Sequence, residues 1–357
     1  MFLFGTLFNV KSKKNALHLA CENDNISQIK TILKFTRAKI DAFDWNNETP
    51  LHIACRRGNK QIVETLLDHG ASVHKTNYLA NTALYIACSN ENEQLIEVLI
   101  KKGSIVDIDN GIGYTPLHIS CYRKNVRIVE SLLCNGANSN TQNFNGETPL
   151  HIACFKQSLP IVELLLKFKA NTEIMSNSGD TPLHVSSQFN NIIICHKLIK
   201  QGANVNKQNM KFETPLHQAC LYKSAQLVSF LLKNGAQTWI PDLSGDRPLH
   251  IACKKGDLEI VKELVLFKAN VNTINMNGDT PLHIACKGCH FEIAKKLLDS
   301  GSNRYIKNTK EETAADLSND LNIILLLQTY IPICDLGSEL NLKRHNKNYT
   351  NIQFMFQ

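Results

Sequence analysis

The sequence predicts an all-α solenoid built from short stacked repeats. One observation is a tetrapeptide that returns in a fixed register, and neighbouring copies at Thr115 and Thr148 stand 33 residues apart (148 − 115 = 33). A second is the pair of short apolar segments with helical spacing that follows each copy. Segments this short cannot bury their apolar faces alone, so they must stack on their neighbours. Thr-Pro-Leu-His occurs in full at Thr49, Thr115, Thr148, Thr181, Thr214 and Thr280.

Degenerate copies extend the register to both ends of the solenoid. Thr82 and Arg247 begin altered copies on the same spacing, Asn15 begins the first copy, and Thr313 begins a worn last one. These ten copies predict about nine full repeats followed by a degenerate C-terminal cap.

The second repeat illustrates the predicted elements in chain order. Thr49 precedes a proline, a residue favoured at the first helical position, and a short apolar helix follows. A polar turn at 56–59 ends that helix. A second helix then places Ile62 and Leu66 on one apolar face. Gly70 ends it, and a tip loop leads to the next repeat.

The repeat domain is expected over residues 12–335, between an apolar segment at 1–11 and a polar, flexible tail at 336–357. The units are expected near 12–45, 46–78, 79–111, 112–144, 145–177, 178–210, 211–243, 244–276 and 277–309, with the cap at 310–335. In the cap, Ala314, Ala315 and Leu317 are expected to form a truncated first helix.

Some loops depart from the glycine pattern. Lys169 and Lys268 replace the glycine that ends the second helix, while Asn47, Ala80 and Phe212 replace the glycine of the tip. We expect these loops to be strained or rebuilt.

Composition and charge exclude several classes of function. The net charge is +7, but 39 basic residues are offset by 32 acidic ones along the whole chain, which favours a mixed, solvated surface and no nucleic-acid partner. The apolar start lacks a basic leader and a cleavage site and is too short to span a membrane. A basic cluster at 343–347 remains an alternative contact motif in the tail.

The cysteines predict a reducing environment. Equivalent residues of stacked units lie ~8–10 Å apart, beyond the ~7 Å between Cα atoms that a disulfide can bridge. We therefore expect buried thiols and an intracellular protein, cytoplasmic with the nucleus as a second possibility. Eight of the 12 cysteines share one repeat position: Cys21, Cys55, Cys88, Cys121, Cys154, Cys220, Cys253 and Cys286.

Histidine and cysteine stand three residues apart in most repeats, as in His52 and Cys55, and this spacing could suit a metal site. Two observations argue against that interpretation. The pair repeats with the fold, and Tyr85 fills the histidine position in the third unit. We interpret these histidines as ties between adjacent tips. We expect no metal, no cofactor and no catalytic centre, because no catalytic motif stands apart from the repeat.

The 33-residue period and Thr49-Pro50-Leu51-His52-Ile53-Ala54 with its copies resemble the ankyrin repeat family. The resemblance covers residues 12–329. It implies a protein-binding module whose free positions lie on the tips and the ends of the first helices, on the concave side. The residues at these positions are Trp45, Glu48, Arg56, Arg57, Tyr78, Tyr114, Tyr122, Arg123, Phe144, Phe155, Phe189 and Tyr222.

Aromatic and arginine side chains are the types that dominate binding hot spots. We therefore expect a non-enzymatic, monomeric scaffold or adaptor that binds a protein partner through its second to seventh units, because the last units offer no aromatic residue at these positions. One alternative is an inhibitory or effector protein that occludes a signalling or transcription partner. Another is that the rings merely cover neighbouring tips.

Overall fold

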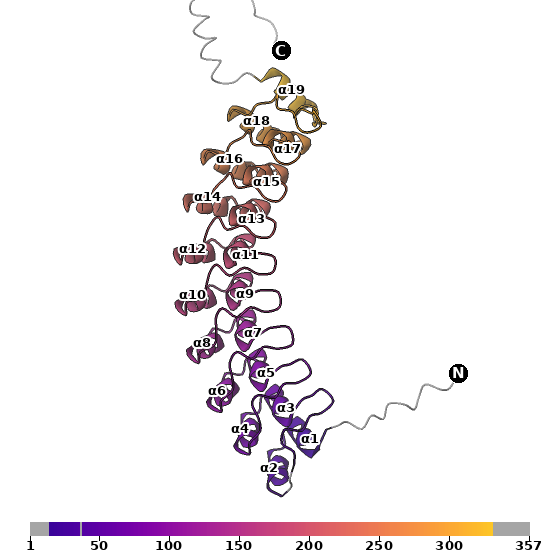
Figure 1. The fold of residues 1–357 in the computed structure, drawn as a ribbon, viewed down its shortest axis with the longest axis vertical. Helices are drawn as coiled ribbons and strands as arrows, with labels where there is room; N and C mark the ends of the chain where they lie inside the picture. The colour runs from indigo at the N-terminus through magenta and orange to yellow at the C-terminus, as the bar shows by residue number, and fades with distance from the viewer. Residues whose placement is uncertain (1–13, 36–37, 331–357) are drawn as a thin grey trace, which may run out of the picture. The chain divides into compact units, whose positions relative to one another are not determined.

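Short helices connected by turns and tip loops make up the chain (Figure 1). The computed structural model describes residues 14–35 and 38–330. Within these ranges it contains nineteen α-helices, and the β-type pairing there is an isolated bridge between Thr76 and Thr82. The predicted all-α repeat fold is therefore confirmed. The apolar segment 1–11, the tail 336–357 and its basic cluster lie outside the described residues.

The chain divides into two units by its internal contacts. The first takes residues up to 186 together with 193–203, and the second takes 187–192 together with residues from 204 onward. Helices of the first unit are α1 Ala16–Glu22, α2 Ile26–Phe35, α3 Pro50–Arg57, α4 Lys60–Asp68, α5 Ala83–Ser89, α6 Glu93–Lys101, α7 Pro116–Arg123, α8 Val126–Cys134, α9 Pro149–Phe155 and α10 Leu159–Lys167, with most of α11 Pro182–Gln188 and α12 Ile192–Lys200. Those of the second are α13 Pro215–Leu221, α14 Ala225–Lys233, α15 Pro248–Lys255, α16 Leu258–Leu266, α17 Pro281–Lys287, α18 Phe291–Asp299 and α19 Leu321–Thr329.

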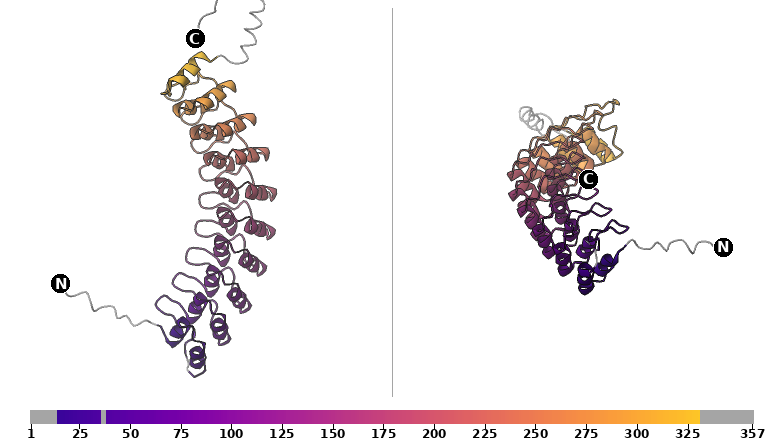
Figure 2. Two further views of the ribbon diagram at one scale, coloured as in Figure 1. Left: turned by 180° about the vertical axis from the view of Figure 1, so that it is seen from behind. Right: turned by 60° about the horizontal axis from the view of Figure 1, so that its bottom comes forward.

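Within each unit the helices form two rows. In the first unit α1, α3, α5, α7 and α9 pack in succession, and α2, α4, α6, α8 and α10 form the second row. In the second unit α13, α15 and α17 form one row, and α14, α16, α18 and α19 the other. The tip loops project from the first-helix row, on the side away from the second helices (Figures 1 and 2).

The space between the rows is filled by aliphatic side chains. In the fifth repeat Leu150 comes from α9, and Ile161, Val162 and Leu165 come from α10, and all four are completely buried. Full burial of such side chains stabilises the fold by about 1.5–3 kcal/mol each. Because the same positions are apolar in the second to ninth repeats, the core continues from one repeat to the next within a unit.

A capping box begins most first helices. The Thr148 side chain accepts a hydrogen bond from the backbone N–H of His151, and the Thr148 N–H donates to His151 Nδ1 at 3.1 Å. Since Nδ1 accepts this bond, the imidazole proton resides on Nε2. That N–H donates to the backbone oxygen of Asp180 in the next repeat at 2.9 Å. The predicted role of these histidines as ties between tips is confirmed.

Two local predictions need correction. The cap does not form a truncated first helix: residues 314–317 make only a turn, in which the Asp316 carboxylate accepts hydrogen bonds from the Thr313 N–H and hydroxyl. The loops without glycine are not rebuilt, because each replacement keeps the left-handed backbone of the residue it replaces. The φ angles are 60° at Lys169 and Lys268, 59° at Phe212, 57° at Ala80 and 51° at Asn47.

Candidate protein-binding surface

Two sets of positions place large side chains outside the stacked core. One set lies on the tips, two residues before the tip glycine, and the other lies where the first helices end. The fold fixes both sets, because the flanking capping boxes and apolar helix faces recur in most repeats. The predicted rings of the first unit are exposed here: Trp45 at 62%, Tyr78 at 64% and Phe144 at 67% on the tips, and Tyr122 at 43% and Phe155 at 48% at the helix ends.

Three of the predicted residues meet in a hollow between the second and third repeats. Glu48, Arg56 and Tyr78 line a cavity of about 320 Å³ together with Asn81, Tyr85 and neighbouring residues. Within the described residues, Asn81 Oδ1 is buried and accepts no hydrogen bond. The hollow therefore places an exposed ring, Tyr78, beside polar side chains.

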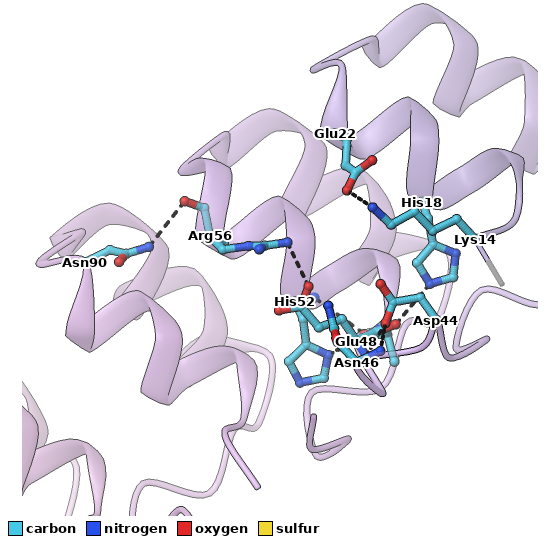
Figure 3. A network of polar contacts seen from close by, with 10 residues as sticks. Lys14, His18, Glu22, Asp44, Asn46, Glu48, His52, Arg56 and Asn90 are labelled. Atoms are coloured by element: carbon cyan, nitrogen blue, oxygen red, sulfur yellow. Dashed lines mark hydrogen bonds and ion pairs between the residues drawn. The ribbon is translucent and has the colours of Figure 1, made fainter. Parts of the chain in front are cut away.

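Glu48 is not the free surface residue that the sequence suggested. It is buried, and its carboxylate accepts a hydrogen bond from the Arg56 guanidinium at 2.7 Å (Figure 3). Burial raises the pKa of Glu48, and the charge of Arg56 opposes that shift. His18 of the first repeat donates through Nε2 to the backbone oxygen of Glu48. Glu48 thus holds Arg56 in place.

The other predicted cations differ in their surroundings. Arg57 pairs with Asp24 of the preceding repeat at 3.0 Å. Arg123 is exposed and forms no ion pair within the described part of the chain. Arg123 is therefore the predicted arginine of this surface whose charge remains available.

Lys156 connects the rings that end α7 and α9. Its ammonium lies 3.6 Å from the ring centroid of Tyr122 and 5.6 Å from that of Phe155. Such cation–π contacts contribute ~0.5–1 kcal/mol at exposed sites. Tyr114 is different: it is half-buried against His118, with ring centroids 5.6 Å apart, so part of its role is to pack the tip.

Phe189 and Tyr222 belong to the second unit. Both rings are exposed, at 37% and 54%. They directly follow α11 and α13, one residue later in the repeat than Tyr122 and Phe155.

Sequence reasoning missed an apolar tip surface in the second unit. Phe212, Trp239, Leu243 and Met276 line a hollow of about 440 Å³, and each of these side chains is exposed. Met276 and Leu243 occupy the tip position that Trp45 and Phe144 hold in the first unit. This shared repeat position could have predicted the apolar tip surface from the sequence. The prediction relied on aromatic residues at that position, where Leu243 and Met276 are aliphatic, and the aromatic Phe212 and Trp239 stand at other positions of the repeat.

Arg247 anchors this second set of tips. It replaces the threonine that begins a first helix elsewhere, and its guanidinium donates to the backbone oxygens of Trp239 and Ile274 at 3.0 Å each. The tips that carry the hollow are thereby tied to each other.

The repeated histidines and cysteines do not form a metal site within the described residues, where no group of three or more suitable ligands gathers. The ring nitrogens of His118 and His151 are occupied by the tip hydrogen bonds. The eight periodic cysteines are buried and free of disulfides. Burial raises the pKa of the Cys88 thiol to about 12.

A comparison with known families gives matches over most of the chain. Residues 2–77, 74–143, 127–209 and 216–311 match a family described as ankyrin repeats in three copies. The chain belongs to the ankyrin repeat family. Ankyrin repeats are protein–protein interaction modules, and the resemblance drawn from the tetrapeptide is confirmed.

The chain matches only a small part of the length of two curated relatives. The mouse nuclear factor NF-kappa-B p105 subunit is 40% identical over 68 residues, which is 19% of this chain and 7% of that protein. The chicken p105 subunit is 37% identical over the same shares. A solved structure, the ankyrin repeat domain of Bcl-3, described as a member of the IkappaB protein family, is 27% identical with a TM-score of 0.56, covering 62% of this chain and 99% of that one.

Within the described ankyrin repeats, no helix is both long enough and apolar enough to cross a membrane.

Proposed function

We propose that this chain is a non-enzymatic scaffold or adaptor that binds a protein partner on the concave face formed by the tips and first helices. The observation that supports this most is the exposure of large rings at recurring positions. Trp45 and Tyr78 on the tips, and Tyr122 and Phe155 at the helix ends, remain outside the core. Rings of this size bury 150–250 Å² each when covered, and they are common binding anchors.

The stacked core does not depend on these rings. Leu150 and Val162 are completely buried between the helix rows, whereas the rings project from the row of first helices and its tips. Two arginines lie on the same face. Arg56 pairs with Glu48 at 2.7 Å, whereas Arg123 forms no ion pair within the described residues. A partner with apolar and acidic side chains would suit this surface.

We also propose that the protein acts as a monomer inside the cell, in the cytoplasm or the nucleus, without a nucleic-acid partner. Free, buried cysteines support a reducing compartment. The near balance of 39 basic and 32 acidic residues favours a protein partner over nucleic acid.

A second candidate is a regulator that occludes its partner. The similarity to a nuclear factor subunit and to an IkappaB family member favours a partner in transcription. Capturing a partner and asking whether it keeps its activity while bound separates an adaptor from such a regulator.

Substitution of the rings tests the surface. We expect Trp45→Ala, Tyr78→Ala, Tyr122→Ala and Phe155→Ala each to weaken the affinity for a captured partner by about 2 kcal/mol, because each removes a central anchor. Folding should change little. Affinity is measured by calorimetry with the purified partner, and the free energy of unfolding by urea titration.

Two control variants distinguish binding from folding. Leu150→Ala should destabilise by ~2–5 kcal/mol through a core cavity. Ile193→Ala, at an exposed position of α12 in the second-helix row, should leave both quantities unchanged. If the ring variants lose stability but keep their affinity, the rings serve only to cover the tips and the proposed surface is wrong.

A further inference from the structure

We infer that the second unit carries a separate docking site for an acidic, extended peptide segment of a partner protein. We call this site the lysine row. It consists of Lys223, Lys254, Lys255 and Lys287, at the ends of three successive first helices. It does not depend on the rings of the first unit.

The fold sets the positions of these lysines. Lys254 and Lys287 follow the buried Cys253 and Cys286 and are therefore equivalent residues of α15 and α17, which pack against each other. Lys223 follows Tyr222 at the end of α13, the helix that packs on the other side of α15. Because the helices are stacked, Lys254 and Lys287 lie at the same end of neighbouring helices, and Lys223 lies just beyond the corresponding end of α13.

The charges of the lysine row are unpaired. Within the described residues, none of its members forms an ion pair, and Lys223, Lys254 and Lys287 are exposed. Other lysines of the same unit do find acids: Lys262 lies 2.7 Å from Glu259, for example. The row therefore differs from an ordinary mixed surface.

Acids near the row already serve the fold. Asp257, two residues after Lys255, caps α16 by accepting a hydrogen bond from the Ile260 N–H at 3.1 Å. Three other acids belong to the repeat pattern. They precede the first helices and accept hydrogen bonds from tip amides. Asn275 donates to Asp246 at 2.7 Å, and Asn308 donates to Asp279 at 3.0 Å and to Glu312 at 3.1 Å. These carboxylates stabilise the tips at the opposite ends of the first helices. The ammonium groups of the row, which form no ion pair within the described residues, are therefore available to another molecule.

The helix dipole explains why lysine is tolerated at these positions, but not the charge that remains. A helix C-terminus carries about half a negative charge, whereas Lys254 and Lys255 alone place two full positive charges at the end of α15. An excess of positive charge therefore remains after the dipole is counted.

The geometry favours a peptide over nucleic acid. Stacked helices lie ~8–10 Å apart, and an extended chain advances ~3.3 Å per residue, so an acid at every third residue meets one helix end after another. Single-stranded nucleic acid is bound through successive stacked rings. The row has one neighbouring ring, Tyr222.

The probe for the test is a fluorescein-labelled peptide of tandem Glu-Leu-Ser triplets, measured by fluorescence polarisation with the full chain. We expect saturable binding that weakens as salt is added. A peptide of Lys-Leu-Ser triplets should not bind. The double variant Lys254→Glu, Lys287→Glu should bind the acidic peptide about tenfold more weakly or worse.

A second double variant, Lys233→Glu with Lys295→Glu, makes the same change in net charge on exposed positions of the second helices α14 and α18. Its affinity should stay within about threefold of the unaltered chain. Equal losses in both double variants, or no saturable binding of the acidic peptide, would overturn the inference. So would tighter, row-dependent binding of a single-stranded oligonucleotide. None of these outcomes bears on the rings of the first unit, so this inference and the proposed function can fail separately.

Discussion

The buried histidines show how one residue type serves two repeats at once. His118 accepts a hydrogen bond at Nδ1 from the Thr115 N–H at 3.2 Å and donates from Nε2 to the Glu147 backbone oxygen at 3.1 Å. Both bonds need the neutral ring with its proton on Nε2. Burial lowers the pKa of His118 to about 4, which keeps the ring in that form at neutral pH.

This histidine makes stability depend on pH. The unfolded chain binds a proton on His118 below pH about 6.5, while the folded chain does so only below about 4. Stability is therefore full above pH 6.5 and falls as the pH drops from there to about 4, by up to ~3 kcal/mol for this residue. Urea unfolding at pH 7 and pH 5 measures the loss.

The control for this prediction is His118→Tyr, which copies the residue that the third repeat carries at Tyr85. We expect the variant to be less stable than the unaltered chain at pH 7 but to lose less stability between pH 7 and pH 5. A loss equal to that of the unaltered chain would show that other groups cause the pH dependence.

The sequence located single residues well where the repeat itself determines their surroundings. Cys154 was predicted to be buried, and it is. Glu48 was placed on the surface, although it is buried and bound to Arg56. Its burial depends on how neighbouring tips fold over it, a contact between residues far apart in the chain that periodicity does not reveal.

At the helix ends too, contacts between repeats determine the structure, as the residues with left-handed backbone show. Gly70 ends α4 with φ of 87°, and Lys268 takes the equivalent place after α16 with φ of 60°. The neighbouring repeats impose the loop conformation, and the lysine bears the strain. The sequence predicted that this loop would be strained or rebuilt. The loop keeps its conformation, because the stacking of neighbouring repeats outweighs the preference of lysine for negative φ angles.

Replacement of this lysine should stabilise the protein. A non-glycine residue in the left-handed conformation costs ~1–2 kcal/mol, partly offset by the entropy that glycine loses on folding. We expect Lys268→Gly to raise the free energy of unfolding by ~0.5–1 kcal/mol, as measured by urea titration.

The reverse substitution is the matched control. Gly70→Lys should destabilise by a similar amount through backbone conformation alone, because an added Cβ at Gly70 meets no atom within 4 Å. Equal stabilities of the two variants and the unaltered chain would mean that these loops carry no strain.

At the scale of the whole molecule, the reactivity of the cysteine thiols measures how readily the stacked repeats open. Nine of the eleven cysteines in the described residues are buried, and Cys134 and Cys289 are exposed. Burial raises the pKa of Cys21 and Cys286 to about 12. These buried thiols react only when a repeat opens.

We therefore expect a maleimide reagent to label Cys134 and Cys289 first in the native protein. Among the buried thiols of the first unit, Cys21 in the terminal repeat should follow before Cys121, because a terminal repeat has one stacked neighbour fewer. Mass spectrometry of peptides over time gives the order. Labelling of Cys121 as fast as Cys134 would contradict the stacked core.

The histidine bonds also bear on how a gene for this chain can change length. His118 reaches Glu147 and His151 reaches Asp180, each 29 residues further on. Excision of residues 119–151 removes 33 residues and leaves His118 in the place of His151, 29 residues before Asp180. Recombination in whole repeats therefore keeps these imidazoles bonded. A change of another length must be absorbed in a loop, as in the first repeat, where His18 reaches the Glu48 backbone oxygen 30 residues further on. Each permitted step also adds or removes one exposed tip and one helix end, so the binding surface can be lengthened or shortened without altering the bonds that hold it.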